Sequence, residues 1–230
     1  MIKKILVTGA TGFIGHHLIA ALAKQDVLIY AFSNDAVSKN LGFGNKVVNI
    51  SGDLTQKKSL INIPKDIDFV FHLAAVFNAE EKIIYETNVN GTKNLLDYTC
   101  NTVEQFILFS TISVYGIKSG LGLDEESRMA PDTIYGKSKL EAENLVIKYG
   151  KDCGFKTTIL RLPAVYGPGS KNDMRKIIQA VNTPYFVMIG FGDNKRSMVY
   201  VGNVTDAAIA CMQRQHENSE VFIVKDSLDY

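Results

Sequence analysis

The chain has 230 residues, of which 46% are hydrophobic and 21% charged, and its formal net charge is +1. This composition suits a globular protein with a sizeable core, and the near-zero charge excludes electrostatic steering toward nucleic acid or an anionic membrane surface. No apolar run approaches the roughly 20 residues of a membrane span, and the short basic N-terminus lacks the pattern of a signal peptide. We therefore expect a cytoplasmic protein without nucleic-acid or membrane partners.

The cysteines point the same way. Cys100, Cys153 and Cys211 are far apart in the sequence and odd in number. This pattern makes neither a metal-binding spacing nor a disulfide framework. We therefore expect a reducing compartment and no metal site.

The first fifteen residues carry the strongest local motif. The apolar run at residues 5–7 predicts a strand, the amphipathic stretch at 16–24 predicts a helix, and Gly9, Gly12 and Gly15 stand between them. Strand, glycine turn and helix in this order place backbone N–H groups and a helix N-terminus against a pyrophosphate. The spacing is G-x-x-G-x-x-G instead of G-x-G-x-x-G. An ordinary tight turn is the alternative, but the position at the N-terminus favours dinucleotide binding.

Further strands and helices alternate along the chain. Strands are predicted at residues 27–32, 46–50, 66–75, 105–109 and 157–162. Helices are predicted at 80–102 and 135–151, with a polar loop at 116–133. Strands separated by helix-length segments imply parallel βαβ units, and so an α/β fold with a Rossmann-like, doubly wound parallel sheet.

The pattern changes after Arg161, where prolines and glycines interrupt it. A helix at 174–182, strands at 185–189 and 196–201, and a terminal strand at 220–224 are predicted there. We interpret residues 1–162 as a dinucleotide-binding domain and 163–219 as a partial, small substrate-binding lobe. Residues 220–230 would hold the terminal strand that rejoins the main sheet.

Three residues form the candidate catalytic set. Ligands of open parallel sheets bind beyond the C-terminal ends of the strands, and Thr111 is predicted at such an end. Tyr135 and Lys139 are four residues apart and share one helical face. The ammonium would lower the pKa of the phenol from its ordinary value near ~10, which suits acid–base work on a substrate oxygen. A chance Tyr–Lys pair on a surface helix is the alternative, and the upstream glycine turn decides against it.

These motifs together resemble the extended short-chain dehydrogenases/reductases of the nucleotide-sugar epimerase/dehydratase type. The matching segments follow the family's order and spacing and cover nearly the whole chain. They are residues 8–15, 53–54, 72–75, 88–92, 110–116, 135–139 and 161–168. The motifs are specific for the family and much less so for the substrate.

The resemblance implies a role for each matching residue. Tyr135 would be the acid/base, and Lys139 would lower its pKa and hold the nicotinamide ribose. Thr111 stands at the position where the family carries a catalytic Ser or Thr. The implied cofactor-binding residues are Gly9, Gly12, Phe13, Ile14, Gly15, Ser33, Asn34, Asp53, Leu54, Leu73, Ala74, Ala75, Asn88, Tyr135, Lys139 and Pro163. The implied substrate contacts are Thr111, Tyr135, Ala164 and Arg196.

Arg196 matches an arginine that commonly clasps a nucleotide pyrophosphate. A guanidinium fork suits phosphate oxygens, but a surface arginine beside Lys195 explains the residue equally well.

The implied cofactor is NAD(P). Relatives that prefer NAD carry an acidic residue after the second strand, where it binds the ribose hydroxyls. Ser33 and Asn34 stand there instead and can both hydrogen-bond a 2′-phosphate, so NADP is modestly favoured. The alternative is that Asp35 takes the acidic role.

The substrate side departs from the common family pattern. Ala164 stands where epimerases often carry Asn, and the familiar acidic residue near 202–203 is missing. Ile112 and Ser113 follow Thr111 where dehydratases carry an acidic pair. The segment 196–204 is more similar to members that reduce a 4-keto sugar nucleotide. The resemblance therefore implies an NAD(P)-dependent oxidoreductase acting on a nucleotide sugar, by 4-keto reduction or 4-epimerisation.

Two alternatives stay open. The chain could be a non-catalytic dinucleotide-binding regulator or assembly protein. Relatives also continue for several more helices, so the substrate lobe is expected to be truncated: either this is a fragment, or the pocket is open and completed by a second subunit. The resemblance implies a homodimer.

Overall fold

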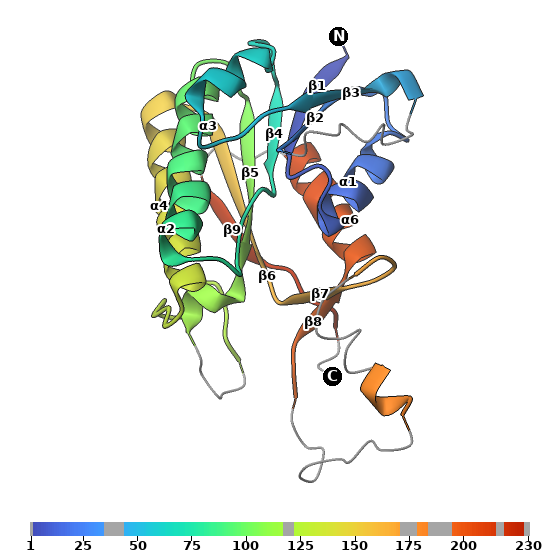
Figure 1. The fold of residues 1–230 in the computed structure, drawn as a ribbon, viewed down its shortest axis with the longest axis vertical. Helices are drawn as coiled ribbons and strands as arrows, with labels where there is room; N and C mark the ends of the chain where they lie inside the picture. Colours follow the sequence, from blue (N-terminus) through green and yellow to red (C-terminus); the bar gives the residue numbers. More distant parts are fainter. Residues whose placement is uncertain are drawn as a thin grey trace.

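The structure is a computed structural model that describes residues 2–34, 44–116, 122–170, 179–183, 195–214 and 219–227. A twisted parallel sheet lies at its centre, with helices on both faces (Figure 1). Within the described residues, this sheet has seven strands in the order β3-β2-β1-β4-β5-β6-β9. These are β1 (Lys3–Thr8), β2 (Val27–Ser33), β3 (Val47–Ser51), β4 (Phe69–His72), β5 (Gln105–Thr111), β6 (Lys156–Leu162) and β9 (Glu220–Ile223).

The strand order reverses between β1 and β4. The chain runs outward from β1 through β2 to β3, and then returns to pair β4 with the other side of β1. Every neighbouring pair is parallel. The predicted Rossmann-like, doubly wound sheet is therefore confirmed, and the reversal marks the place where such sheets bind ligands.

Helices cover both faces of the sheet because its strands are apolar on both sides. Alternate residues of β1 enter different cores: Ile5 and Val7 pack on one side and Leu6 on the other. Helices α1 (Phe13–Leu22) and α6 (Val201–Gln213) cover one face. The other face carries α2 (Glu81–Tyr85), α3 (Thr92–Thr99) and α4 (Ile134–Cys153) (Figure 1).

Short elements connect the layers. They are the 3-10 helices η1 (Gly44–Lys46), η2 (Lys57–Asn62) and η4 (Ile112–Tyr115), and the strands β7 (Ala164–Tyr166) and β8 (Met198–Tyr200). The last two pair with each other in parallel. The chain thus leaves the main sheet after β6 to form a small second sheet, and β9 pairs with β6.

Two predicted elements differ from the structure. The expected single helix at 80–102 is interrupted by the π-helical segment η3 (Glu86–Gly91), which separates α2 from α3. Helix α6 was not predicted: the expected strand at 196–201 is only β8, and the chain turns helical at Val201. The helix predicted at 174–182 is described only from residue 179, and the strand predicted at 185–189 lies outside the described residues. The division into domains stays a prediction.

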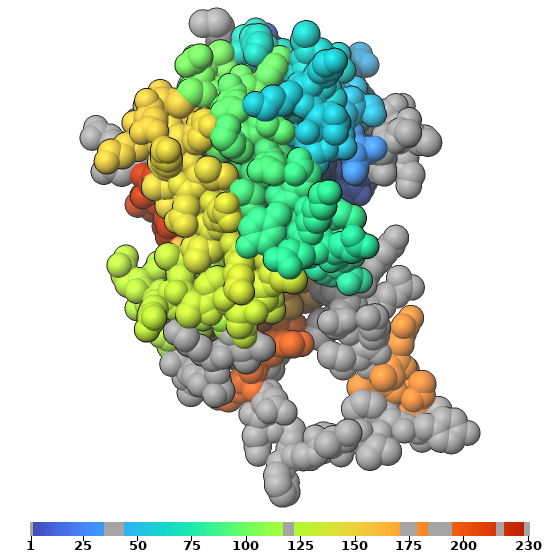
Figure 2. Space-filling view, turned by 60° about the vertical axis from the view of Figure 1, so that its left-hand side comes forward, coloured from blue at the N-terminus to red at the C-terminus, as the bar shows by residue number. Residues whose placement is uncertain are grey.

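The expectation that the cysteines make no disulfide is wrong. Cys100, at the end of α3, and Cys153, at the end of α4, form one with a Cα–Cα distance of 5.7 Å. Figures 1 and 2 show the two helices side by side on one face of the sheet. The bond joins residues 53 positions apart, so sequence spacing does not reveal it. The argument for a reducing compartment loses its premise.

No helix within the described residues is long and apolar enough to cross a membrane.

We expect reduction of the Cys100–Cys153 bond to destabilise the protein. Closing a loop of 53 residues limits the unfolded chain and is worth about 4 kcal/mol in the chain-entropy model. Urea unfolding of purified protein with and without reductant measures the loss. Cys100→Ser should be as unstable as the reduced wild type and insensitive to reductant. Alkylation of all three cysteines in the unreduced, denatured protein would contradict the bond.

Candidate active site

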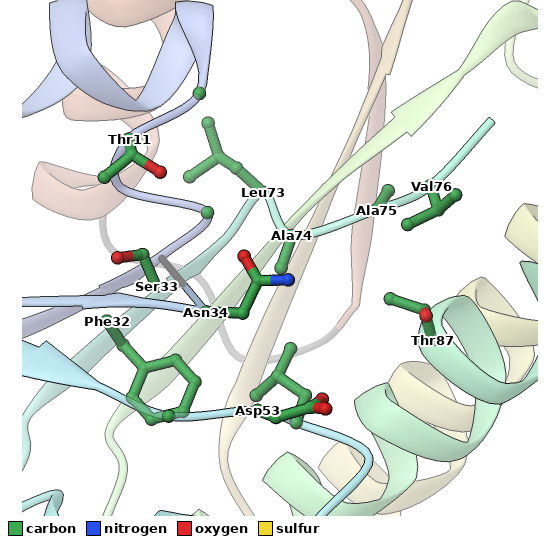
Figure 3. A pocket seen from close by; sticks show the side chains of 14 residues that line it. Thr11, Phe32, Ser33, Asn34, Asp53, Leu73, Ala74, Ala75, Val76 and Thr87 are labelled. Carbon is green, nitrogen blue, oxygen red and sulfur yellow. The ribbon is translucent and has the colours of Figure 1, made fainter. Parts of the chain in front are cut away.

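A groove runs along the carboxyl ends of the central strands. Its two parts share Gly9, Gly12, Leu73 and Ala75, so they form one continuous depression across the β1–β4 junction. One part is also lined by Thr11, Phe32, Ser33, Asn34, Gly52, Asp53, Leu54, Ala74, Val76 and Thr87 (Figure 3). The other is also lined by Phe13, Ile14, Gly15, Phe77, Phe109, Ser110, Thr111, Tyr135, Leu162, Pro163 and Val165.

Where β1 turns into α1, two positions have no room for a side chain. Gly9 has a φ of +67°, and a Cβ there would lie 2.8 Å from the backbone nitrogen of Ala74. A Cβ on Gly15 would lie 2.3 Å from the carbonyl oxygen of Gly9. The backbone of this turn therefore forms the wall of the groove.

Helix α1 opens toward this groove with Gly12 as its N-cap. Among the described residues no side chain caps the helix, and its first turn carries no acidic side chain. The first N–H groups of a helix lack intrahelical partners and carry a partial positive charge. A bare helix N-terminus in a groove suits a pyrophosphate, so these residues fit a dinucleotide.

One end of the groove is polar. Ser33 and Asn34, from the end of β2, face it together with Asp53, which follows β3 (Figure 3). Asp53 accepts a hydrogen bond from the backbone N–H of Thr55 at 2.9 Å, which fixes its carboxylate in a tight turn. The structure thus brings together the residues predicted for the adenosine end of the cofactor.

The other end contains two of the three candidate catalytic residues. Thr111 at the end of β5 and Tyr135 in the first turn of α4 both line it. The Thr133 hydroxyl accepts a hydrogen bond from the Gly136 N–H at 3.0 Å and so starts α4 just before Tyr135. The ring of Phe77 meets the Tyr135 ring edge-on, with centroids 6.3 Å apart.

The Thr111 hydroxyl also has a structural role. It accepts a hydrogen bond from the Ser113 N–H and donates one to the Ser113 hydroxyl, both at 3.1 Å. These bonds cap η4, which begins directly after the strand. The hydroxyl oxygen is thereby held at the groove, where it retains capacity to accept a further bond.

The pKa values of the Tyr–Lys pair depart from the expectation. Lys139 is only 2% exposed, and burial lowers its pKa to about 8, against the opposing charge of Glu143. Burial raises the pKa of Tyr135 to about 12. The expected lowering of the Tyr135 pKa by Lys139 is thus wrong for the protein alone. Loss of hydration sets the direction of both shifts, and the four-residue spacing alone does not lower the pKa of Tyr135.

A buried hydrogen-bond chain runs beneath the groove. The Ala74 N–H donates to the Thr8 hydroxyl at 3.3 Å, and Thr8 lies 2.6 Å from Nδ1 of His72. Nε2 of His72 lies 2.8 Å from the Thr92 hydroxyl, which donates to the Asn88 carbonyl at 2.6 Å. Because both hydroxyls are then assigned, His72 carries its proton on Nε2. Burial and the charge of Lys139 lower the pKa of His72 to about 3, so it stays neutral.

Asn88 links this hydrogen-bond chain to helix α4. Its side-chain oxygen accepts from the Val76 N–H at 2.8 Å, and its amide donates to the Val76 carbonyl at 2.9 Å and to the Ser138 hydroxyl at 3.0 Å. Both amide protons are therefore committed within the protein. Asn88 was predicted to bind the cofactor, but it joins α4 to the loop after β4 and does not line the described part of the groove.

The predicted substrate residues of the C-terminal part do not line the described part of the groove, although the two neighbours of Ala164, Pro163 and Val165, do. Ala164 on β7 and Arg196 before β8 are exposed, and neither lines the groove formed by the described residues. A carboxylate does lie beside Asn203, that of Asp226. It accepts from the Asn203 amide at 2.7 Å and from the Tyr166 hydroxyl at 2.8 Å.

Several lining residues were missed by the sequence analysis. Val76 and Phe77 follow β4, and Phe109 and Ser110 precede Thr111. The signal available for these four was their closeness to 73–75 and to Thr111, since residues next to a strand end share its edge of the sheet. Thr87 lies on η3, and no strand end in the sequence marks it.

Comparisons with known proteins agree with this geometry. A family model described as NAD dependent epimerase/dehydratase family matches residues 5–224. The chain is 32% identical over 243 aligned residues to a UDP-glucose 4-epimerase from Vibrio cholerae, covering 100% of this chain and 72% of that protein.

Solved structures give the same result. A UDP-glucuronic acid 4-epimerase from Bacillus cereus in complex with NAD superposes with a TM-score of 0.84 at 28% identity, covering 99% of this chain and 79% of that one. A UDP-N-acetylglucosamine 4-epimerase from Methanobrevibacter ruminantium, in complex with UDP-N-acetylmuramic acid, gives 0.85 at 26% identity, covering 100% and 78%.

We expect Lys139→Met to stabilise the protein at neutral pH. The pKa of Lys139 falls from 10.5 to about 8 on folding, which corresponds to about 3 kcal/mol at about 1.4 kcal/mol per pH unit. Below pH 8 both states are charged, so the folded state bears this full penalty. Between pH 8 and 10.5 only the unfolded state binds the proton, so wild-type stability rises with pH and the gain from the substitution shrinks.

Urea unfolding at pH values from 7 to 10.5 measures this difference. Lys137→Met is the matched control, because Lys137 is exposed on the same helix. A variant Lys139→Met that is no more stable than wild type at pH 7, or whose gain does not change with pH, would contradict the buried charge.

Proposed function

Since the chain belongs to the NAD dependent epimerase/dehydratase family, we propose that it binds NAD and that hydride passes between this cofactor and C4 of a nucleotide sugar. The observation that carries this proposal is one continuous groove that runs from the glycine turn to Thr111 and Tyr135. The redox reaction is either 4-epimerisation, with the cofactor restored in each cycle, or 4-keto reduction.

NAD is the cofactor we propose. Its pyrophosphate would lie against the N-terminus of α1, where Gly12, Phe13 and Ile14 line the groove, and the bound dinucleotide would accept and return a hydride. The NADP preference expected from Ser33 and Asn34 gains no support from the comparisons, because the Bacillus cereus relative is described with NAD. Asp35 lies outside the described residues.

Tyr135 moves the proton in this proposal. Because burial raises its pKa to about 12, the phenol is protonated at neutral pH and suited to donate to a carbonyl oxygen. Accepting a proton from a hydroxyl requires a positive charge nearby, which Lys139 supplies when it is protonated. The Thr111 hydroxyl would orient the same substrate oxygen: it would accept from a substrate hydroxyl, and it would donate to a carbonyl once its proton turns away from Ser113.

The substrate class follows from the relatives. The relatives named above are named for reactions of UDP-sugars, and we propose a nucleotide sugar for this chain. Epimerisation and reduction differ in what they consume: only an epimerase turns over without added reductant. The homodimer and the cytoplasmic location stay predictions.

We expect Tyr135→Phe to abolish turnover while the groove still binds NAD. Losing a positioned acid–base group lowers the rate by roughly 10²–10⁴-fold. Thermal melts with NAD and NADP report binding, because a ligand of the folded state raises its stability. Chromatography of UDP-, dTDP- and GDP-sugars and of their 4-keto derivatives after incubation, with and without added NADH or NADPH, reports conversion and separates epimerase from reductase.

Tyr149→Phe is the control, because Tyr149 lies on the same helix but bonds to Asp97, at the disulfide-bonded end of α4. It should retain wild-type turnover. If Tyr135→Phe converts sugars as fast as wild type, the proposed chemistry is wrong. If NAD binds and no sugar is converted by wild type, the chain is a dinucleotide-binding regulator or assembly protein.

A further inference from the structure

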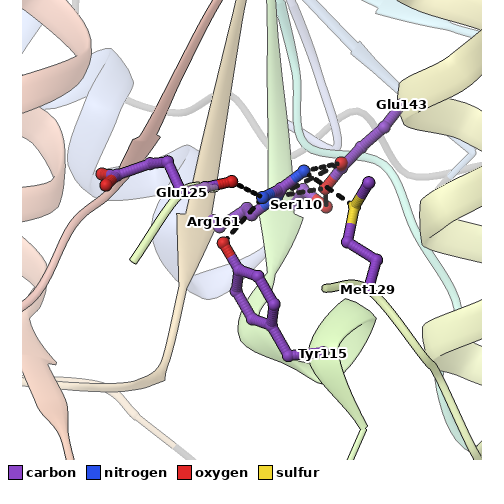
Figure 4. Close-up of polar contacts among 6 residues, drawn as sticks. All are labelled: Ser110, Tyr115, Glu125, Met129, Glu143 and Arg161. Atoms are coloured by element: carbon purple, nitrogen blue, oxygen red, sulfur yellow. Dashed lines mark hydrogen bonds and ion pairs between the residues drawn. The ribbon is translucent and has the colours of Figure 1, made fainter. Parts of the chain in front are cut away.

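A buried ion pair lies directly behind the candidate catalytic residues. Arg161 on β6 and Glu143 on α4 have side chains that are 3% and 2% exposed, and their charged atoms are 2.8 Å apart. Figure 4 shows them at the centre of a polar cluster with Ser110, Tyr115 and Met129. Burying two charges without precise partners is unfavourable, so the contacts of this pair indicate what it does.

The Glu143 carboxylate is bound from two strands. Its two oxygens accept hydrogen bonds from Nε of Arg161 at 3.2 Å each, and Oε2 accepts another from Nη2 at 2.8 Å. The Ser110 hydroxyl donates to Oε1 of the same carboxylate. One carboxylate on α4 thus ties the helix to β5 and β6 together.

The guanidinium of Arg161 is equally committed. Nη1 donates to the Tyr115 hydroxyl at 2.6 Å and to the Glu125 carbonyl at 3.2 Å. Nη2 lies 3.0 Å from the sulfur of Met129, in addition to its bond with Glu143. All donor nitrogens of the fork therefore have partners, which fixes the position of the side chain.

Each segment held by this cluster also carries a residue of the groove. Ser110 precedes Thr111 on β5, and Arg161 is followed by Leu162 and Pro163, which line the groove. Glu143 follows Lys139 by one helical turn on α4, which carries Tyr135 in its first turn. The ion pair is thus the point where the three groove-forming segments are cross-linked.

Charge links the cluster to Lys139 as well. Of the titratable groups around Lys139, His72 on β4 is buried and neutral, and Tyr135, four residues earlier on α4, is protonated at neutral pH. Glu143 supplies the opposite charge that favours the ammonium form of Lys139. One carboxylate therefore serves two cations, Arg161 and Lys139.

We propose that Glu143 and Arg161 are positioning residues for the proposed reaction: they hold α4 in register with β5 and β6, and Glu143 provides the counter-charge of Lys139. This inference rests on the proposed function for its effect on rate. The counter-charge that Glu143 provides to Lys139 does not depend on the proposed function, and it can be measured without a substrate. A purely structural ion pair would stabilise the fold without affecting the reaction rate or the pKa of Lys139.

The first experiment replaces both charges. Glu143→Leu combined with Arg161→Met keeps the volume, and replacing a buried pair by apolar residues of similar size usually preserves the fold. We expect a folded protein with an unchanged KM for the sugar nucleotide and a kcat about 100-fold lower, because a misplacement of about 1 Å costs about that factor. A folded double variant with wild-type kcat would overturn the positioning role.

The second experiment needs no activity. Unfolding free energies of wild type and Lys139→Met, compared over pH, give the pH at which Lys139 loses its proton. The same comparison on Glu143→Gln should move that pH downward, and Glu143→Asp, which keeps the charge, should restore it. An unchanged value in Glu143→Gln would overturn the counter-charge. If Glu143→Gln does not fold, Glu143→Leu with Arg161→Met takes its place in this comparison.

The two experiments separate the possible failures. If wild type converts no sugar nucleotide, the proposed function is wrong and the pH comparison alone decides whether Glu143 acts on Lys139. If wild type is active and the double variant is equally active, the proposed function stands and the positioning role is wrong.

Discussion

The close approach of two backbone segments determines the architecture of this site. At the junction of β1 and β4, where the strand order reverses, Gly9 leaves no room for a side chain against Ala74, and its φ of +67° favours glycine. This contact lets α1 begin at the edge of the sheet with its first N–H groups facing the groove. Strands and helices farther along the chain can then add residues to one depression instead of covering it.

Two polar networks hold α4 against the sheet. The chain from Thr8 through His72 to Asn88 ends on Ser138, and the Glu143–Arg161 pair holds the helix farther along. Lys139 lies between these two ties and remains buried although burial opposes its charge. The fold thus tolerates an unfavourable group where the proposed chemistry needs it, which is a common trade between stability and function.

The sequence predicts the parts of this arrangement that depend on local patterns. Apolar runs predict the strands, and the glycine turn predicts the wall of the groove. It does not predict the Cys100–Cys153 bond, because that contact depends on how α3 and α4 pack. Nor does helical spacing give the pKa of Tyr135, because burial in the folded protein raises it. The bond between Asn88 and Val76 and the bond between Asn203 and Asp226 likewise join residues that are distant in the sequence, so sequence patterns do not predict them.

Calorimetric titration of NAD into Gly9→Ala and Gly154→Ala tests the central claim most directly. Both glycines have positive φ, but a Cβ at Gly154 would meet nothing within 4 Å, whereas one at Gly9 would press on the backbone after β4. Both variants therefore share the conformational strain and only one deforms the groove. We expect Gly154→Ala to bind NAD like wild type and Gly9→Ala to show no binding at concentrations that saturate wild type. Wild-type affinity in a folded Gly9→Ala would contradict the account.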